Sequence, residues 1–136
     1  MRRVFVDAGH LIALLHPRDT LHMAAKTLAQ ELDAAALVTT EMVLVEVLNY
    51  FASHRETLRR IATEYVHRIR ASPRVTVHPQ TSLQFEQALQ RYAERSDKSW
   101  SLTDCASFLL LKSEGIREAA AHDQHFEQAG FVALLR

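Results

Sequence analysis

Short β-like runs alternate with longer helical patterns along this chain, and this alternation limits the possible fold more than any other feature. It is typical of a parallel sheet whose strands are joined by crossover helices. The expected strands are residues 3–6, 36–39, 75–78, 119–122 and 131–135. The sequence therefore predicts an α/β protein with a central parallel sheet of about five strands.

Helical patterns fill the intervals between these runs. The nearly unbroken apolar run 42–51 is too long for a typical strand, so a buried helix is expected there. The other expected helices are residues 11–15, 21–32, 56–70, 83–93 and 101–113. The stretch 123–130 has room for only a turn or about two turns of helix. The alanine-rich fourth strand rests on its place in the alternation, because alanine has poor strand propensity.

Length and composition indicate a single domain over residues 1–136. The chain has 48% hydrophobic residues and only 3 Gly and 3 Pro, and a domain of about 150 residues buries about 68–70% of its unfolded surface. No apolar stretch approaches the roughly 20 residues of a membrane span, and Asp7 comes too early for a signal-peptide core. A single cysteine, Cys105, fits a reducing compartment. We therefore expect a cytoplasmic protein with no membrane partner.

Four acidic residues stand where a folded domain has little structural use for all of them. Asp7 follows the first expected strand, and Asp123 follows the fourth. Asp104 lies in the first turn of its helix, and Glu46 interrupts an apolar helix. Sites in open α/β sheets form beyond the carboxyl ends of the strands. This topology allows the four carboxylates to meet.

Helix capping is the structural alternative for three of these acids. Asp7 and Asp123 are each placed to cap the segment that follows, and Ser101 with Asp104 resembles a capping box. Glu46 has no such alternative. A carboxylate in a buried helix is desolvated and needs a partner.

Convergence of four carboxylates requires compensation. Each pair about 4 Å apart repels by about 4 kcal/mol at an effective dielectric near 20. No lysine or arginine is adjacent to any of the four in the sequence, so a divalent cation or a raised pKa is the expected remedy. Oxygen ligands without cysteine favour Mg²⁺ or Mn²⁺ over zinc.

The segments that carry the acids resemble those of PIN-domain nucleases, particularly VapC-type toxins of toxin–antitoxin systems. They are VFVDAGHL (4–11), TTEMVLVEV (39–47), DKSWSLTDCAS (97–107) and HDQHF (122–126), in the family's order along the whole chain. The resemblance implies a three-layer α/β/α sandwich and a Mg²⁺- or Mn²⁺-dependent endoribonuclease. It also implies products with a 5′-phosphate and a 3′-hydroxyl.

The same resemblance implies functional residues and partners. It assigns Asp7, Glu46, Asp104 and Asp123 as catalytic residues and as metal ligands, directly or through water. It further implies an RNA substrate, a cognate antitoxin that covers the acidic groove, and a homodimer.

Two positions depart from the family pattern. Gly9 stands where relatives usually carry a hydroxyl residue, and Ala121 replaces a common serine or threonine two positions before Asp123. Loss of such hydrogen-bonding partners weakens a metal site. A catalytically weak or inactive PIN-fold module for protein or RNA binding therefore stays as the alternative. A phosphotransferase of the haloacid-dehalogenase kind is disfavoured, because it needs a second aspartate at position 9.

Candidate RNA contacts lie in two segments. Residues 54–74 hold six arginines against two glutamates, which is either a solvated helix face or a phosphate-contacting rim that includes Arg55, Arg59 and Arg60. Lys98 and Trp100 lie beside the third acid and are placed to contact phosphate and to stack a base. Packing in the core is the alternative for Trp100.

Other polar residues receive structural interpretations. His122 and His125 flank Asp123, but two histidines without further nitrogen or sulfur ligands are a weak zinc signal, so surface roles are expected. Cys105 is expected to be a small core residue. Asp97 is expected to be a solvated loop residue, with positioning of water or substrate as the alternative.

Overall fold

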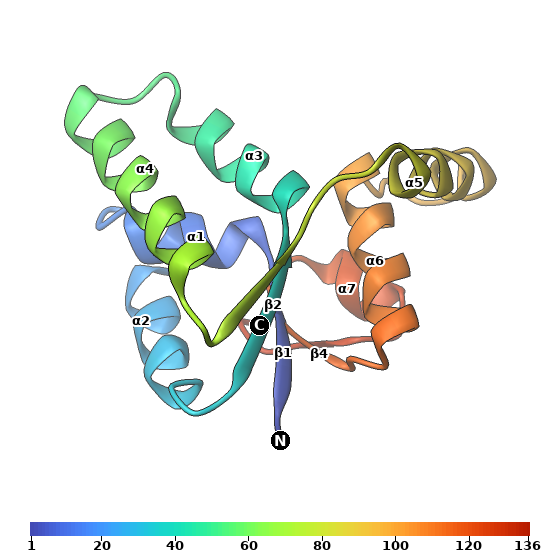
Figure 1. Cartoon of the computed structure of the whole chain (residues 1–136), viewed down its shortest axis with the longest axis horizontal. Coiled ribbons are helices and arrows are strands. Elements are labelled where there is room, and N and C mark those ends of the chain that lie inside the picture. Colours follow the sequence, from blue (N-terminus) through green and yellow to red (C-terminus); the bar gives the residue numbers. More distant parts are fainter.

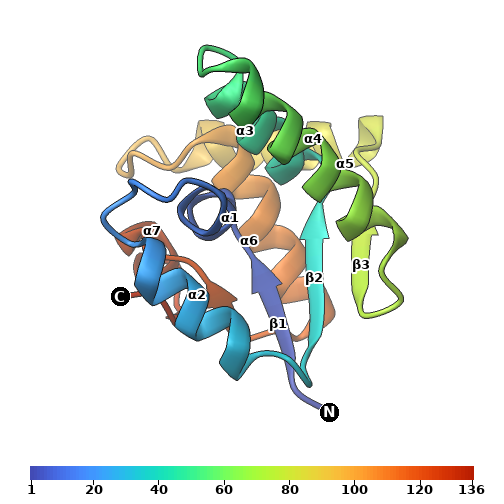
Figure 2. The same ribbon diagram turned by 90° about the vertical axis from the view of Figure 1, so that its left-hand side faces the viewer.

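The computed structural model describes all 136 residues and contains one five-stranded parallel sheet in the order β3-β2-β1-β4-β5. The strands are β1 (Arg3–Val6), β2 (Ala36–Thr40), β3 (Val75–His78), β4 (Glu118–Ala120) and β5 (Val132–Ala133). Figure 2 shows β1 and β2 side by side with their arrowheads at the same end. The predicted α/β class and the five-stranded parallel sheet are confirmed.

Helices cover both faces of this sheet, which makes three layers (Figure 1). One layer holds α1 (Ala8–Leu15), α2 (His22–Glu31), α3 (Glu41–Phe51) and α4 (Glu56–Ala71). The other holds α5 (Ser82–Glu94), α6 (Leu102–Glu114) and α7 (Gln124–Gln128). No helix has both the length and the apolar character that crossing a membrane requires.

The central strand β1 is apolar throughout its buried part because helices cover it on both sides. Val4 and Phe5 are fully buried. Phe5 belongs to the larger hydrophobic cluster, which also contains Phe51 and Phe126. Val4 belongs to a second cluster with Leu28 of α2. The alternation of side chains along β1 thus joins the two halves of the core.

Local signals in the sequence set the helix ends. Thr40 begins α3 by accepting a hydrogen bond from the Val43 amide at 3.1 Å. Thr81 and Gln84 form a capping box at the start of α5. Gly115 ends α6 with φ 68°, a left-handed conformation that glycine adopts without steric cost.

Several predicted boundaries were wrong. Strand β4 ends at Ala120 instead of residue 122, and β5 contains only two residues. Helix α1 begins at Ala8, directly after Asp7. The helix predicted to be buried over residues 42–51 is buried on one side only, because Val45 and Tyr50 are 51% and 40% exposed.

The strand order creates a crevice at one end of the sheet. The chain leaves β1 toward β2 on one side, while β4 pairs with β1 on the other, and ligands of open α/β sheets bind at such a switch point. Two hydrogen bonds fix this end of β1. The Asp7 amide donates to the Ala120 carbonyl at 3.1 Å, and the Thr39 hydroxyl donates to the Val6 carbonyl at 2.8 Å.

Candidate functional site

The four predicted acids line a single open cavity of about 950 Å³ at this end of the sheet. Asp7 comes from the end of β1, and Asp123 from the loop after β4. Glu46 comes from α3 and Asp104 from the first turn of α6. The structure therefore brings these four side chains together around one cavity, as the topology allows.

Asp7 is the most buried of the four acids. Its residue is 9% exposed, and its side chain makes no capping hydrogen bond to α1. Burial, together with repulsion from Asp104, Glu46 and Asp123, raises the pKa of Asp7 to about 7, although the Ala8 amide opposes the shift. The capping alternative therefore does not explain Asp7.

Glu46 is half-buried on α3, and two residues of the same helix, Val43 and Val47, are fully buried. Burial raises the pKa of Glu46, and the charge of Asp104 adds to the shift. The predicted buried helix is buried on one side only, but the expected desolvation of this carboxylate is present.

Asp104 caps its helix and also faces the cavity. Its Oδ2 accepts a hydrogen bond from the Ser101 amide at 3.1 Å, and the Ser101 hydroxyl accepts one from the Asp104 amide at 3.0 Å. The capping box predicted as an alternative is therefore real. It uses one carboxylate oxygen, and Oδ1 has no protein hydrogen bond.

Asp123 likewise caps a helix, α7, and faces the cavity. Its Oδ1 accepts a hydrogen bond from the His125 amide at 2.9 Å. Its Oδ2 makes no protein hydrogen bond. Capping and participation in the site are thus compatible for both aspartates, because a carboxylate has two oxygens.

The prediction of a surface role for His125 was wrong. Its side chain is only 17% exposed, with Nδ1 2.9 Å from Asp104 Oδ2 and 3.2 Å from Asp123 Oδ1. Its Nε2 lies 3.3 Å from the Ser99 hydroxyl. The buried neighbour Phe126 anchors this segment in the core, which directs His125 toward the acids. His122 instead places Nδ1 2.9 Å from the Leu135 carbonyl oxygen.

Sequence reasoning missed several other residues that line the cavity, and three of them are polar groups at its edge. Asn49 and Tyr50 come from the last turns of α3, and Arg136 comes from the end of the chain. The spacing of Asn49 and Tyr50 from Glu46, three and four residues, was the available signal, because such residues share a helix face. Arg136 offered no comparable signal, since its position depends on β5.

The donor chemistry of the cavity fits a hard divalent cation. All four acids provide carboxylate oxygens, and even the two helix-capping aspartates, Asp104 and Asp123, each keep one oxygen without a protein partner. No three His, Cys, Asp or Glu side chains lie close enough together to coordinate a metal ion directly. Mg²⁺ commonly keeps several waters and uses only one or two carboxylates. The site therefore suits a hydrated cation held partly through water.

The predicted stacking role of Trp100 is contradicted by its burial. The residue is 5% exposed, its ring packs edge-on against Phe108 at 5.0 Å, and Arg95 covers it at 4.8 Å. Its indole N–H donates to Gln128 at 3.1 Å. Core packing, the alternative interpretation, describes Trp100.

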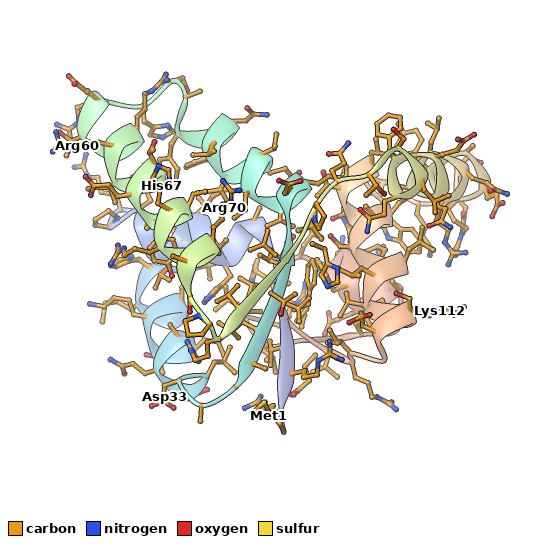
Figure 3. All side chains as sticks on the ribbon, in the orientation of Figure 1. Met1, Asp33, Arg60, His67, Arg70 and Lys112 are labelled. Atoms are coloured by element: carbon orange, nitrogen blue, oxygen red, sulfur yellow. The ribbon has the colours of Figure 1, made fainter.

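The other predicted RNA contacts also lie outside the cavity lining. They are Lys98, Arg55, Arg59 and Arg60. The three arginines are exposed at the start of α4, and Figure 3 shows Arg60 on the outer side of that helix, away from the sheet. They occupy a separate surface, and only an RNA long enough to extend past the cavity could contact it.

Two further predictions concern residues near the site. Cys105 is fully buried, as expected of a core residue. Asp97 lies outside the cavity lining and is paired with Arg95, whose Nε and Nη2 donate to its two oxygens at 2.9 and 3.1 Å. Its side chain is 60% exposed, which agrees with a solvated loop residue.

Comparisons with known proteins agree with this architecture. The PIN domain model matches residues 4–132. The "23S rRNA-specific endonuclease VapC20" of Mycobacterium tuberculosis, in strains CDC 1551 / Oshkosh and ATCC 25618 / H37Rv, is 32% identical over 134 residues, which is 96% of this chain and 97% of the relative. The crystal structure of M. tuberculosis VapC20, described as a "Sarcin-Ricin loop cleaving toxin", superposes with a TM-score of 0.83 at 29% identity and covers 95% of this chain and 96% of that one. The chain belongs to the PIN domain family.

Proposed function

We propose that this protein is a metal-dependent endoribonuclease and the toxin of a VapBC-type toxin–antitoxin system. The observation that carries the proposal is the group of four carboxylates around Asp7 at the switch point of the sheet. Similarity over nearly the whole length to VapC20, named as a ribosomal RNA endonuclease, supports RNA as the substrate class.

The proposed cofactor is Mg²⁺ or Mn²⁺. The carboxylate of Asp7, whose pKa is raised by burial and by three acidic neighbours, gains stability from a cation that neutralises the group. When bound, a divalent cation polarises the phosphodiester and supplies the hydrolytic nucleophile from water. No nucleophilic side chain is then required.

The protein's own groups have complementary tasks in this proposal. Asp7, Glu46, Asp104 and Asp123 hold the cation, directly or through water. His125 fixes the orientation of Asp104 through its hydrogen bond at 2.9 Å. The Asn49 amide and the Ser99 hydroxyl line the same cavity and offer hydrogen bonds to the RNA backbone. Arg55, Arg59, Arg60 and Lys98 are proposed to attract phosphates farther along the strand.

The proposed partners are a cognate antitoxin and a second copy of this chain, in the cytoplasm. Helix α5 extends beyond α6 at one side of the molecule (Figure 1). It exposes Phe85, Leu89 and Tyr92, at 40%, 49% and 51%, at helical spacing. Exposed apolar patches of this kind mark protein–protein contacts, and this stripe is the proposed dimer contact. The antitoxin is proposed to cover the acidic cavity.

The alternative function is an inactive PIN-fold module that binds protein or RNA. The observation that favours it is the absence of hydroxyl side chains at Gly9 and Ala121. Nothing lies within 4 Å of a Cβ placed at Gly9, so no packing constraint explains the glycine.

Cleavage of a structured RNA by the purified protein tests the proposal. Cleavage should require Mg²⁺ or Mn²⁺, stop in EDTA, and fall by at least about 100-fold in the Asp7→Asn protein. Asp97→Asn is the matched control, because Asp97 is exposed and lies outside the cavity. Equal cleavage by Asp7→Asn would reject this site. Absence of both cleavage and a metal-dependent rise in melting temperature would favour the inactive module.

A further inference from the structure

Tyr50 forms an aromatic edge of the acidic cavity. It follows Glu46 by four residues on α3, so the two side chains share one helix face with Cβ atoms about 5–6 Å apart. Both line the cavity, and Tyr50 is 40% exposed. An exposed ring therefore stands one helical turn from a site carboxylate, a separation that one nucleotide can span.

Neighbouring rings hold Tyr50 in place. It stacks on His54 with ring centroids 4.8 Å apart and an interplanar angle of 30°. Phe51, which is 1% exposed, contacts it edge-on at 5.0 Å, and His16 approaches its edge at 6.3 Å. The ring is thus fixed before any substrate arrives, which lowers the conformational entropy lost on binding.

An uncharged ring suits this position in a cavity rich in carboxylates. The acids repel the phosphates of RNA, so affinity near them has to come from groups without negative charge. Aromatic side chains bind bases through their π faces, independently of base sequence. Proteins that recognise RNA commonly stack bases that are splayed out of loops or single strands.

We propose that Tyr50 stacks a base of the RNA next to the scissile phosphodiester. This inference rests on the proposed function and adds a base-binding residue to that site. A base within a helix has both faces covered by its neighbours, so a regular duplex cannot use the platform.

A fluorescence experiment tests this inference by binding alone. The probe is a short single-stranded oligoribonucleotide with one central 2-aminopurine, added to Asp7→Asn protein so that cleavage does not interfere. Stacking on Tyr50 should quench the probe. The additional change Tyr50→Phe should preserve the quenching. Tyr50→Leu should abolish it and weaken binding about 5-fold to about 150-fold, the range expected for one stacked base.

Two controls separate stacking from structural damage. Tyr65→Leu removes a tyrosine ring from α4 outside the cavity lining and should leave binding and quenching unchanged. An oligoribonucleotide with an abasic nucleotide at the probe position should bind the Tyr50 and Tyr50→Leu proteins equally. A folding defect in Tyr50→Leu would instead weaken both oligoribonucleotides to the same degree.

Unchanged quenching and affinity in Tyr50→Leu would overturn the inference. Loss of quenching in Tyr50→Phe would also overturn it, since the hydroxyl and not the ring would then be responsible. A different outcome would refute the proposed function. The unmodified protein would then fail to cleave RNA with Mg²⁺ or Mn²⁺, although the quenching and the binding would still depend on Tyr50.

Discussion

Asp104 Oδ2 accepts hydrogen bonds from two directions, because His125 Nδ1 lies 2.9 Å away and the Ser101 amide 3.1 Å away. The aspartate is therefore held by its own helix and by α7 at once. This fixes the rotation of the carboxylate and leaves Oδ1 for a ligand.

Replacement of His125 should weaken the site without removing an acid. His125→Ala is expected to lower metal-dependent RNA cleavage about 10- to 100-fold, the usual effect of losing a residue that orients a metal ligand. Initial cleavage rates across a Mn²⁺ titration measure it. His67→Ala, an exposed histidine of α4 seen in Figure 3, should match the parent protein. A parental rate in His125→Ala would show that Asp104 needs no support from α7.

The metal-free protein should lose stability as the pH rises from about 4 to about 7. The pKa of Asp7 is raised from 3.8 to about 7, so in this range the unfolded state has released a proton that the folded state retains. Stability then falls with pH by about 1.4 kcal/mol per pH unit.

Asp7→Asn replaces this titrating carboxyl group with an amide that does not ionise. The difference in unfolding free energy between Asp7→Asn and the parent should therefore be more favourable to the variant at pH 8 than at pH 4, by up to about 4 kcal/mol in the metal-free protein. Urea denaturation in EDTA at both pH values measures the change. A difference between the two proteins that does not vary with pH would contradict the raised pKa.

Restoring a hydroxyl at position 9 should tighten cation binding. Gly9 lines the cavity, and no atom lies within 4 Å of a Cβ placed there. Gly9→Ser is therefore expected to fold normally and to bind Mn²⁺ more tightly, by about tenfold if the hydroxyl supports a carboxylate. Calorimetric titration measures it. Gly9→Ala is the control, since a gain shared by both variants would come from the helix and not from the hydroxyl.

Replacement of Trp100 should affect stability more than specificity. Trp100→Ala removes a buried ring and the indole hydrogen bond to Gln128, and such large-to-small changes cost about 3–5 kcal/mol. Denaturation measures this loss. The positions of RNA cleavage should not change at temperatures where the variant is folded. A shifted cleavage pattern would return Trp100 to the substrate contacts.

A charge in the exposed stripe of α5 should separate the proposed dimer. Leu89→Asp is expected to lower the molar mass in light scattering from that of two chains to that of one, because an interface cannot bury an unpaired carboxylate cheaply. Thr63→Asp, an exposed position on α4, adds the same single negative charge away from the stripe and controls for the charge change. A parent protein that is already monomeric would exclude this contact.

The sequence alone determined the fold class, because the periods of strands and helices depend on local patterns of apolar residues. It also placed Asp7 directly after β1 and Asp123 in the chain segment that follows β4, and it identified Glu46 as an acid that needs a partner. Strand boundaries at β4 and β5 were less accurate, since short alanine-rich strands depend on pairing with their neighbours.

Only the tertiary structure decided which side chains meet. Whether Trp100 or Tyr50 offers a ring to a ligand depends on how α3 and the segment before α6 pack against the rest of the fold, and local sequence does not specify that packing. The same is true of His125, which reaches Asp104 across a separation of 21 residues. The sequence supplied the acids and their order, whereas packing gave them a shared cavity, a supporting imidazole and an aromatic rim.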